Sequence, residues 1–588
     1  MIEAVPSHSL NTHIYTFNFK YIIMKNKCLN FLLFVVVAFV SPGLLWAQNQ
    51  PVKGKVLDEK TKEALIGVSV LEAGSTSNGT VTDLDGNFSL SVPEGATLRI
   101  SYVGYLVQEI PLNGRKSLEV LLKEDTEMLD EVVIVGYGVQ KKATLSGSVT
   151  SIGGEKLANT PVTNVSQGLA GRLPGVVAIS NTAEPGYDGA TIRIRGVNTF
   201  GKADPLVVVD GVPGRSLERI DPSTIETMSV MKDASAAIYG AQAANGVIII
   251  TTKRGKKGKP TVNLSYNYGI SRPTVIPEMA NASEYATLLN EIDKYAGNKE
   301  RYTPEDIQKY RDGSDPWSYP NTDWFKETLK PWSPQTYANA TIDGGTDNMT
   351  YFVSVSAKTQ DGFYRNSGTK YNQYDLKSNL DLKLNKYINL FMNLTGRMED
   401  RKYPTRSSEN IFRMLMRSKP NMPAYWPNGL PGPDIEFGDN PVVIATDATG
   451  YERDKRYILN GDFGVNINVP YVEGLTLKAT ASLDKNFRFR KIWQTPWTLY
   501  SWDGTSMDEN NNPLLVEGKK GFSDPRLRES MEDNQNILLS GIINYNRTFA
   551  ENHSVNVLAG AERITGKGDS FEAFRRYFIS TAIDELFA

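Results

Sequence analysis

The sequence has almost none of the side chains from which metal sites and nucleophilic catalytic centres are built. Its 588 residues include one cysteine, Cys28, and three histidines, at positions 8, 13 and 553. Only His553 lies beyond the apolar leader described below. Disulfides, Cys/His zinc sites and cysteine nucleophiles therefore lack their residues, and a Ser-His-Asp triad would depend on His553 alone. The sequence argues against an enzyme and predicts no metal and no cofactor.

The chain also has no large excess of positive or of negative charge. The formal net charge is −2, so the chain as a whole offers no basic field for nucleic acid. A short basic run at 253–259 has no interleaved aromatic side chains, and we interpret it as a solvated hinge instead of a nucleic-acid patch.

The one long apolar run near the N-terminus, Leu29–Val40, follows Lys25 and Lys27. It is shorter than the ~20 residues that a membrane-spanning helix needs. Basic residues, a short apolar core and the small residue Ala47 are the pattern of a signal peptide that is cleaved after Ala47. Met24 is the more natural start of such a leader.

The segment Leu129–Lys142, LDEVVIVGYGVQKK, has the character of a strand that pairs with another chain. Its four β-branched residues, Val132–Val135, favour an extended conformation. The flanking charges and glycines favour a short strand that adds to the edge of another sheet, although an ordinary buried strand is the alternative. A dinucleotide-binding loop is disfavoured, because Lys141 replaces the third glycine and no helix pattern follows.

Two folded regions are expected on either side of this segment. Short alternating runs within 52–123 predict a small β-sandwich, in which Asp83, Asp85 and Asn87 indicate a hairpin turn more than a calcium loop. Residues 143–255 predict an α/β unit with a helix between 223 and 239. Its Arg193 and Arg195 alternate with isoleucines, which places both guanidinium groups on one face of a strand.

From Thr261 onwards, apolar and polar residues alternate strictly over segments of about ten residues or more, as in transmembrane β-barrels. Short and long gaps alternate between these segments. Short periplasmic turns and long extracellular loops alternate in the same way in outer-membrane barrels. Nine strands are predicted, near 261–270, 335–343, 349–358, 371–384, 387–399, 455–468, 475–489, 531–547 and 553–566.

Five segments occur in the order of the motifs of a known family: LDEVVIVGYG, IRIRG, VVVDGVP, SVMKDASAAIYG and AANGVIIITTKRG. The sequence resembles the SusC/RagA family of TonB-linked outer-membrane transporters from about Val52 to its C-terminus. The resemblance implies a mainly β chain with a small β-sandwich, an α/β plug and the first part of a large transmembrane β-barrel. The implied domains are an upstream extension and signal peptide (1–47), a carboxypeptidase-regulatory-like β-sandwich (48–125), the TonB-box region (126–142), the plug (143–258) and a partial barrel (259–588).

The resemblance also implies TonB-dependent import of a nutrient across the outer membrane of a Gram-negative, Bacteroidetes-like cell. A glycan is favoured as the substrate and a peptide is the alternative. The implied partners are the TonB–ExbB–ExbD complex, a SusD-like surface lipoprotein and outer-membrane lipid, with no nucleic acid. The TonB box would comprise Asp130, Glu131, Val132, Val133, Ile134, Val135 and Gly136.

All tryptophans after Trp46 fall in the long predicted loops. Their faces can stack on sugar rings, although packing within the loops or an interfacial belt is the alternative. The candidates for substrate contact are Trp317, Trp324, Trp426, Trp497 and Trp502, and the candidates for contact between plug and barrel are Arg193 and Arg195.

Three other interpretations stay open: a siderophore or cobalamin receptor, a surface binding protein without transport, and an inactive fragment. An open barrel edge in lipid would leave ~5 N–H and C=O groups unpaired, each at a cost of several kcal/mol. Since nine strands are fewer than half of the family's barrel, we expect the chain to be part of a longer product.

Overall fold

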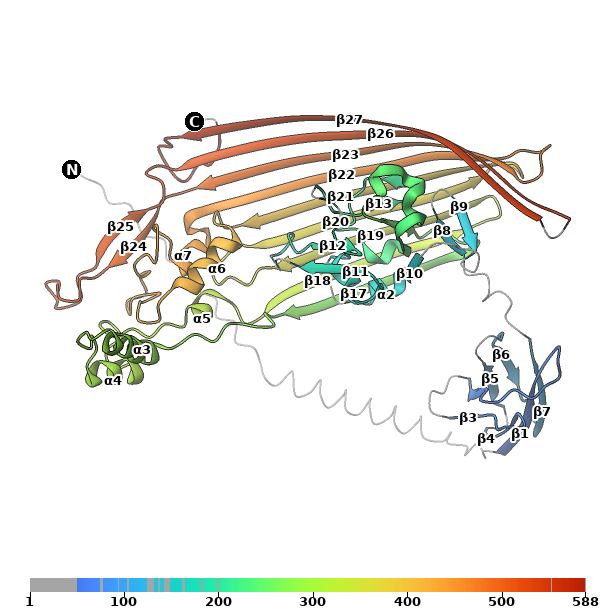
Figure 1. Cartoon of the computed structure of the whole chain (residues 1–588), viewed down its shortest axis with the longest axis horizontal. Coiled ribbons are helices and arrows are strands. Elements are labelled where there is room, and N and C mark those ends of the chain that lie inside the picture. The colour runs from blue at the N-terminus through green and yellow to red at the C-terminus, as the bar shows by residue number, and fades with distance from the viewer. Residues whose placement is uncertain are drawn as a thin grey trace, which may run out of the picture. The chain divides into compact units, whose positions relative to one another are not determined.

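The computed structural model describes residues 50–586 with gaps (Figure 1). The predicted signal peptide and Asp130, Glu131 and Gly136 of the predicted TonB box lie outside the described residues. The chain divides into two compact units, 1–131 and 132–588. The gaps are at 74–77, 94, 103–104, 124–131, 136–137, 142–148, 161–163, 181, 183, 198, 200 and 551–552.

The first unit is the predicted β-sandwich. One sheet has the order β4-β1-β7 and the other β3-β2-β5-β6. Alternate residues of the strands are buried, and apolar side chains from both sheets, Val56, Val70, Phe88 and Ile100 among them, form one core. The strands are β1 (Gln50–Asp58), β2 (Ser69–Glu72), β3 (Gly79–Val81), β4 (Asn87–Val92), β5 (Thr97–Ser101), β6 (Gln108–Pro111) and β7 (Ser117–Leu122).

The segment Asp83–Asn87 forms a turn. The Asp83 carboxylate accepts hydrogen bonds from the N–H groups of Asn87 and Asp85, at 2.8 and 3.0 Å. The bond from Asn87 is the main cause of a lowered pKa of Asp83. The turn links β3 to β4, which belong to different sheets. The expectation of a hairpin is therefore wrong, although the turn chemistry was predicted.

The second unit begins with the antiparallel pair β8 (Val132–Val135) and β9 (Gly138–Lys141). An α/β body at 149–254 follows, which we call the inner domain. It has a sheet of order β10-β15-β16-β13-β14 and a separate pair, β11-β12. Its elements are β10 (Val149–Gly153), α2 (Gly154–Ala158), η3 (Gln167–Leu169), β11 (Val176–Ser180), β12 (Ala190–Ile194), β13 (Leu206–Val209), β14 (Val212–Pro213), η4 (Pro222–Thr224), β15 (Ile225–Met231), η5 (Asp233–Ala243) and β16 (Val247–Thr252).

The helix expected between 223 and 239 is wrong over residues 225–231, because β15 occupies Ile225–Met231. Ile225, Met228 and Val230 are fully buried in the main core of the inner domain. Strand β15 lies between β10 and β16 in the sheet. Pairing on both edges and burial of its apolar residues outweigh the weak local preference for a helix.

The rest of the second unit is a nine-stranded antiparallel sheet in which neighbours in sequence are neighbours in space. We call it the wall, and it confirms the nine predicted strands. In Figure 1 the short turns lie at one end of the wall and the long connections at the other. The strands are β17 (Gly258–Ser271), β18 (Ser333–Gly345), β19 (Met349–Asp361), β20 (Lys370–Lys383), β21 (Ile388–Tyr403), β22 (Gly450–Asn468), β23 (Leu475–Gln494), β26 (Arg526–Phe549) and β27 (His553–Arg576).

The long connections fold over one another around a core that includes Trp324, Ile411, Ile444 and Trp497. Among the residues that the structure describes, no helix has the length and apolar character needed to cross a membrane. The connections contain α3 (Ala282–Tyr295), α4 (Pro304–Asp312), α5 (Trp324–Thr328), α6 (Ser408–Arg417), α7 (Pro441–Ile444), η6 (Asp447–Thr449), β24 (Trp497–Ser501) and β25 (Val516–Lys520).

Burial on the wall is the reverse of that in a soluble sheet. On β20 the polar side chains of Gln373 and Asn379 are fully buried, whereas Tyr374 and Leu376 are 51% and 54% exposed. The polar residues face the inner domain, so we call this side the inner face and the apolar side the outward face. An apolar outward face over strands of this length is typical of strands that face lipid.

The outward face gives the first prediction. Leu376→Arg in the complete protein should destabilise the folded barrel in lipid vesicles by about 2–4 kcal/mol, because a charge at mid-membrane depth is poorly solvated. Leu376→Met, which keeps an apolar side chain, is the control. Urea unfolding from vesicles measures the difference, and equal stability of the two variants would contradict an outward face in lipid.

Candidate functional site: the seam between the inner domain and the wall

The inner domain contacts the wall chiefly through polar side chains. Its contributions come from the segment between β13 and β15, from the last residue of β16 and from the residues that follow β16. The wall contributes from the inner faces of β18, β20, β21, β22 and β23. We call this contact the seam, and its residues are Asp210, Arg215, Arg219, Asp221, Thr252, Lys253 and Arg254 on the inner domain, against Tyr337, Gln373, Lys377, Asn379, Asp381, Asn393, Asp462 and Asp484.

Arg215 is the strongest single tie. Gly214, with φ +83°, follows β14 and turns the chain so that Arg215 reaches two wall strands. Its Nη2 donates to Asp462 Oδ1 at 2.5 Å and to Asp484 Oδ1 at 2.7 Å, and its Nε donates to Asp484 Oδ2 at 3.0 Å. Burial lowers the pKa of Arg215, but bonds to Asp484 and Asp462 outweigh it, so the pKa is raised. Arg215 therefore clamps the inner domain to β22 and β23.

A second group of ties lies where β13 and β16 end. The Asp210 carboxylate accepts bonds from the N–H and hydroxyl of Thr252, at 2.9 and 2.7 Å, and lies 3.7 Å from Lys377 Nζ. Burial raises the pKa of Asp210, but the Lys377 charge and the Thr252 bonds outweigh it and lower the pKa. Asn379 donates to Thr252 Oγ1 at 2.9 Å and to the Lys253 carbonyl at 2.7 Å.

Arg219 links the seam to the β11–β12 connection. It forms an ion pair with Asp188 in which both side chains are 2% exposed. Its carbonyl accepts a bond from Gln373 at 2.9 Å, and its guanidinium lies 4.6 Å from the centre of the Tyr371 ring. In the same region the Tyr403 hydroxyl donates to the Pro185 carbonyl at 2.6 Å. Ionic and aromatic contacts thus hold this connection against the wall.

The seam also contains a cavity of about 280 Å³. Most of the residues that line it are polar by type, among them Arg215, Lys377, Arg397, Asp484 and Asn534. A polar cavity of this size admits water, which can take over hydrogen bonds when side chains part. The seam therefore combines strong individual ties with room for their exchange.

Glu184 lies at the loop side of the seam. Burial raises its pKa to about 7, with a further rise from the Glu452 charge and an opposing effect of a hydrogen bond from Ser408. Ser408 begins α6 in a long connection. Glu184 thus binds a proton near neutral pH where the inner domain meets the loops.

The arginines predicted from the sequence do not supply the ties described above. Arg193 forms an ion pair with Asp204 at 2.6 Å and donates to the Ile192 carbonyl, both within the inner domain. Strand β12 ends at Ile194, and Arg195 has φ +55°, outside the strand region. Contact of Arg195 with the wall stays a prediction. Arg215 follows the VVVDGVP motif, which is the only sequence signal that could have pointed to it.

The predicted tryptophans lie under and between the long connections. Trp324, Trp426 and Trp497 are buried, and their indole N–H groups donate to backbone carbonyls. Trp317 stacks on Trp426 at 5.6 Å between ring centres, and Trp502 meets both rings edge-on. Trp317 and Trp502 are half-buried, so they are the least buried members of the predicted set.

Comparison with known proteins adds two domain matches. The TonB-dependent Receptor Plug Domain matches residues 141–247, and the CarboxypepD_reg-like domain matches residues 52–134. The plug match covers most of the inner domain. Both assignments agree with the resemblance of the sequence.

Full-length relatives are similar over most of this chain. The TonB-dependent receptor SusC of Bacteroides thetaiotaomicron is 33% identical over 72% of this chain and 43% of its own length. The TonB-dependent receptor P39 of Formosa agariphila is 31% identical over 91% and 48%. A RagAB peptide importer structure has 23% identity and a TM-score of 0.63 over 78% of this chain and 51% of its own, which shows a shared fold. The chain spans about half the length of the relatives it matches.

The Arg215 clamp predicts a large effect of mutation. Arg215→Met should lower the stability of the docked inner domain by about 3–5 kcal/mol, because the buried Asp462 and the largely buried Asp484 lose their ion-pair partner. Protease sensitivity of the inner domain in increasing urea, in the complete protein, measures this. Arg193→Met, which breaks a partly exposed pair, should cost at most ~1 kcal/mol. Similar effects of both variants would contradict the clamp.

Glu184 predicts a dependence on pH. Its pKa is about 7 in the folded chain against an ordinary 4.5. The folded state therefore holds a proton that the unfolded state has lost between these values, so stability should fall as pH rises from about 4.5 to about 7. Glu184→Gln should remove this component. Urea midpoints at pH 5 and pH 7.5 measure it, and an unchanged pH profile in the variant would refute the assignment.

Proposed function

The chain belongs to the SusC/RagA family of TonB-dependent receptors, and we propose that the complete protein imports a nutrient across the outer membrane of a Gram-negative cell. The inner domain is the plug, and the wall is part of the surrounding barrel. The TonB–ExbB–ExbD complex supplies the energy through the segment Asp130–Gly136. This is a transport role and not an enzymatic one.

The seam is the observation that carries this proposal. Ion pairs and hydrogen bonds dominate it, and a polar cavity runs along it. Polar contacts that part in the presence of water are replaced by bonds to water, whereas an extended apolar contact would resist separation by its whole buried area. A plug held in this way is stable at rest and can still be displaced by a pull.

A SusD-like surface lipoprotein is the proposed partner at the loop end, and a glycan is the proposed substrate. The similarity to SusC of Bacteroides thetaiotaomicron and to the RagAB structures supports the partner, and the partly exposed tryptophans of the connections support the substrate. Trp317 and Trp502 are partly exposed and are the candidates for contact with a sugar ring, whereas Trp324, Trp426 and Trp497 serve chiefly to pack the connections. A peptide is the alternative substrate, since the RagAB structures are described as those of a peptide importer.

Two further functions are compatible with the same architecture. A rhizobactin receptor of Rhizobium meliloti is 40% identical, but only over 15% of this chain. That limited match favours a siderophore receptor less than a SusC-type importer. A surface binding protein without transport would share the fold but would not depend on TonB.

The strand pairing refines where TonB would add a strand. Strands β8 and β9 pair Val135 with Gly138 and Val133 with Gln140. In a hairpin with two residues between its strands, these are the pairs that exchange hydrogen bonds, so the N–H of Ile134 points to the open edge. An added strand would therefore bond to Ile134 and not to Val133.

This geometry predicts a difference between neighbouring proline variants. Ile134→Pro should abolish TonB-dependent uptake with ligand binding intact, because proline removes the donor on the open edge. Val133→Pro removes a bond inside the hairpin and should reduce uptake less. Uptake and cell-surface binding of labelled maltohexaose and of a labelled peptide pool, in cells with and without TonB, measure this. Full uptake by the Ile134 variant would refute strand addition at this edge.

A further inference from the structure

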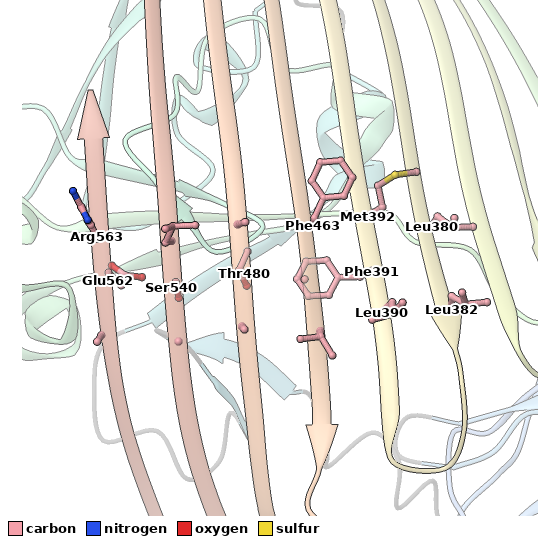
Figure 2. Close-up of a pocket in the computed structure, with 17 residues that line it drawn as sticks. Leu380, Leu382, Leu390, Phe391, Met392, Phe463, Thr480, Ser540, Glu562 and Arg563 are labelled. Atoms are coloured by element: carbon pink, nitrogen blue, oxygen red, sulfur yellow. The ribbon is translucent and has the colours of Figure 1, made fainter. Parts of the chain in front are cut away.

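The outward face of the wall contains a shallow apolar hollow of about 860 Å³, which Figure 2 shows from the outside. We call it the outward groove. It crosses β20 to β23, β26 and β27. Its floor is made of small residues on the last three of these strands, and larger apolar side chains border it. The floor residues are Ala479, Ala481, Gly541 and Ala561, and the bordering residues are Leu380, Leu382, Leu390, Met392, Phe463 and Leu539.

The seam fixes which face carries the groove. Asp381, Asn393 and Asp462 bond to the inner domain, so their side chains lie on the inner face. Side chains alternate between the faces of a strand. Leu380, Met392 and Phe463 each stand one residue away and therefore point outward, to the side that faces lipid.

One charged residue belongs to the same outward row. The strand register pairs Arg563 with Leu539, Leu539 with Ala481, and Ala481 with Phe463. Residues that are directly opposite in a sheet share a face, so Arg563 points outward beside the small residues of the floor. Figure 2 shows Arg563 on β27 at the edge of the groove.

The charge of Arg563 is not balanced as those of its neighbours are. Lys485 and Lys567, on the same face and closer to the long connections, form ion pairs with Asp533 at 2.5 Å and Asp569 at 3.1 Å. Within residues 149–586, as far as the structure describes them, no carboxylate lies within ion-pair distance of Arg563. The adjacent Glu562 alternates to the inner face. An apolar hollow thus lies beside a guanidinium that no carboxylate of the described residues neutralises.

A cation in an apolar, lipid-facing band is unfavourable unless an anion neutralises it. Guanidinium binds phosphate with two parallel hydrogen bonds, and the smooth floor of alanine and glycine accepts a hydrocarbon chain. We propose that the outward groove binds an acyl chain of a phosphate-bearing membrane lipid, with Arg563 bound to the phosphate. The inference rests on the outer-membrane location in the proposed function but not on transport.

The test uses the complete protein in detergent and diphosphoryl lipid A as the probe, with binding followed by native mass spectrometry. Arg563→Gln should weaken binding about ten-fold, the loss expected for one charge-assisted contact. Ala479→Phe and Ala561→Phe fill the floor and should weaken binding to a similar extent. Lys455→Gln, an outward cation away from the groove, is the control and should leave binding unchanged.

Chemically dephosphorylated lipid A should bind the wild-type protein as weakly as diphosphoryl lipid A binds the Arg563 variant. Unchanged lipid A affinity in the Arg563 variant or in both phenylalanine variants would overturn the proposal, as would equal affinity for the two lipids. TonB-dependent uptake is measured on the same variants. Normal uptake together with unchanged lipid binding would reject the groove and leave the transport function standing.

Discussion

The second unit depends on one constraint: the wall carries polar side chains on the face that a soluble sheet would bury against apolar ones. Gln373, Asn379 and Asp462 are almost fully buried. Buried polar groups without partners cost free energy, so this face needs hydrogen-bonding partners or water. The inner domain supplies them through its own polar turns, and the apolar residues of the wall are left to face outward.

The polar contacts determine both how firmly the inner domain is held on the wall and how it can be displaced from it. The tie between Arg215 and two aspartates is strong because it is largely shielded from water and uses several charge-assisted hydrogen bonds. Its loss is costly, since removal of one partner leaves largely buried charges without their ion-pair partner. The Asp188–Arg219 pair carries the contact on towards the loop side, where Glu184 binds a proton near neutral pH. Strength here resides in a few polar ties that a directed pull can part in succession.

The sequence predicted the wall well because one physical rule governs it. A period of two between apolar and polar residues marks a strand between two different environments, and residues 374–384 follow that rule with Ser378 as the exception. The seam was not predictable in the same way. Arg193 sits on a regular strand and pairs locally with Asp204, whereas Arg215 and Arg219 extend from irregular segments whose direction depends on the packing of the whole domain.

The roles of the tryptophans were likewise not predictable from the sequence alone. A tryptophan in a long connection can stack on a ligand or pack the connection, and the sequence is identical in the two cases. The burial of each side chain distinguishes the two roles. Trp324, Trp426 and Trp497 are buried and therefore pack the connections. Strand β15 was missed because two neighbouring strands, distant in sequence, stabilise it.

The central claim is that the inner domain is displaced from the wall during transport, and a reversible lock across the seam tests it most directly. Thr252 and Asn379 are already in contact, with 2.9 Å between Thr252 Oγ1 and Asn379 Nδ2, and Cys28 is the one cysteine among the 588 residues of this sequence. In the complete protein, Thr252→Cys with Asn379→Cys should lose TonB-dependent uptake when oxidised and regain it on reduction. Full uptake by the oxidised, cross-linked protein would contradict displacement at this part of the seam.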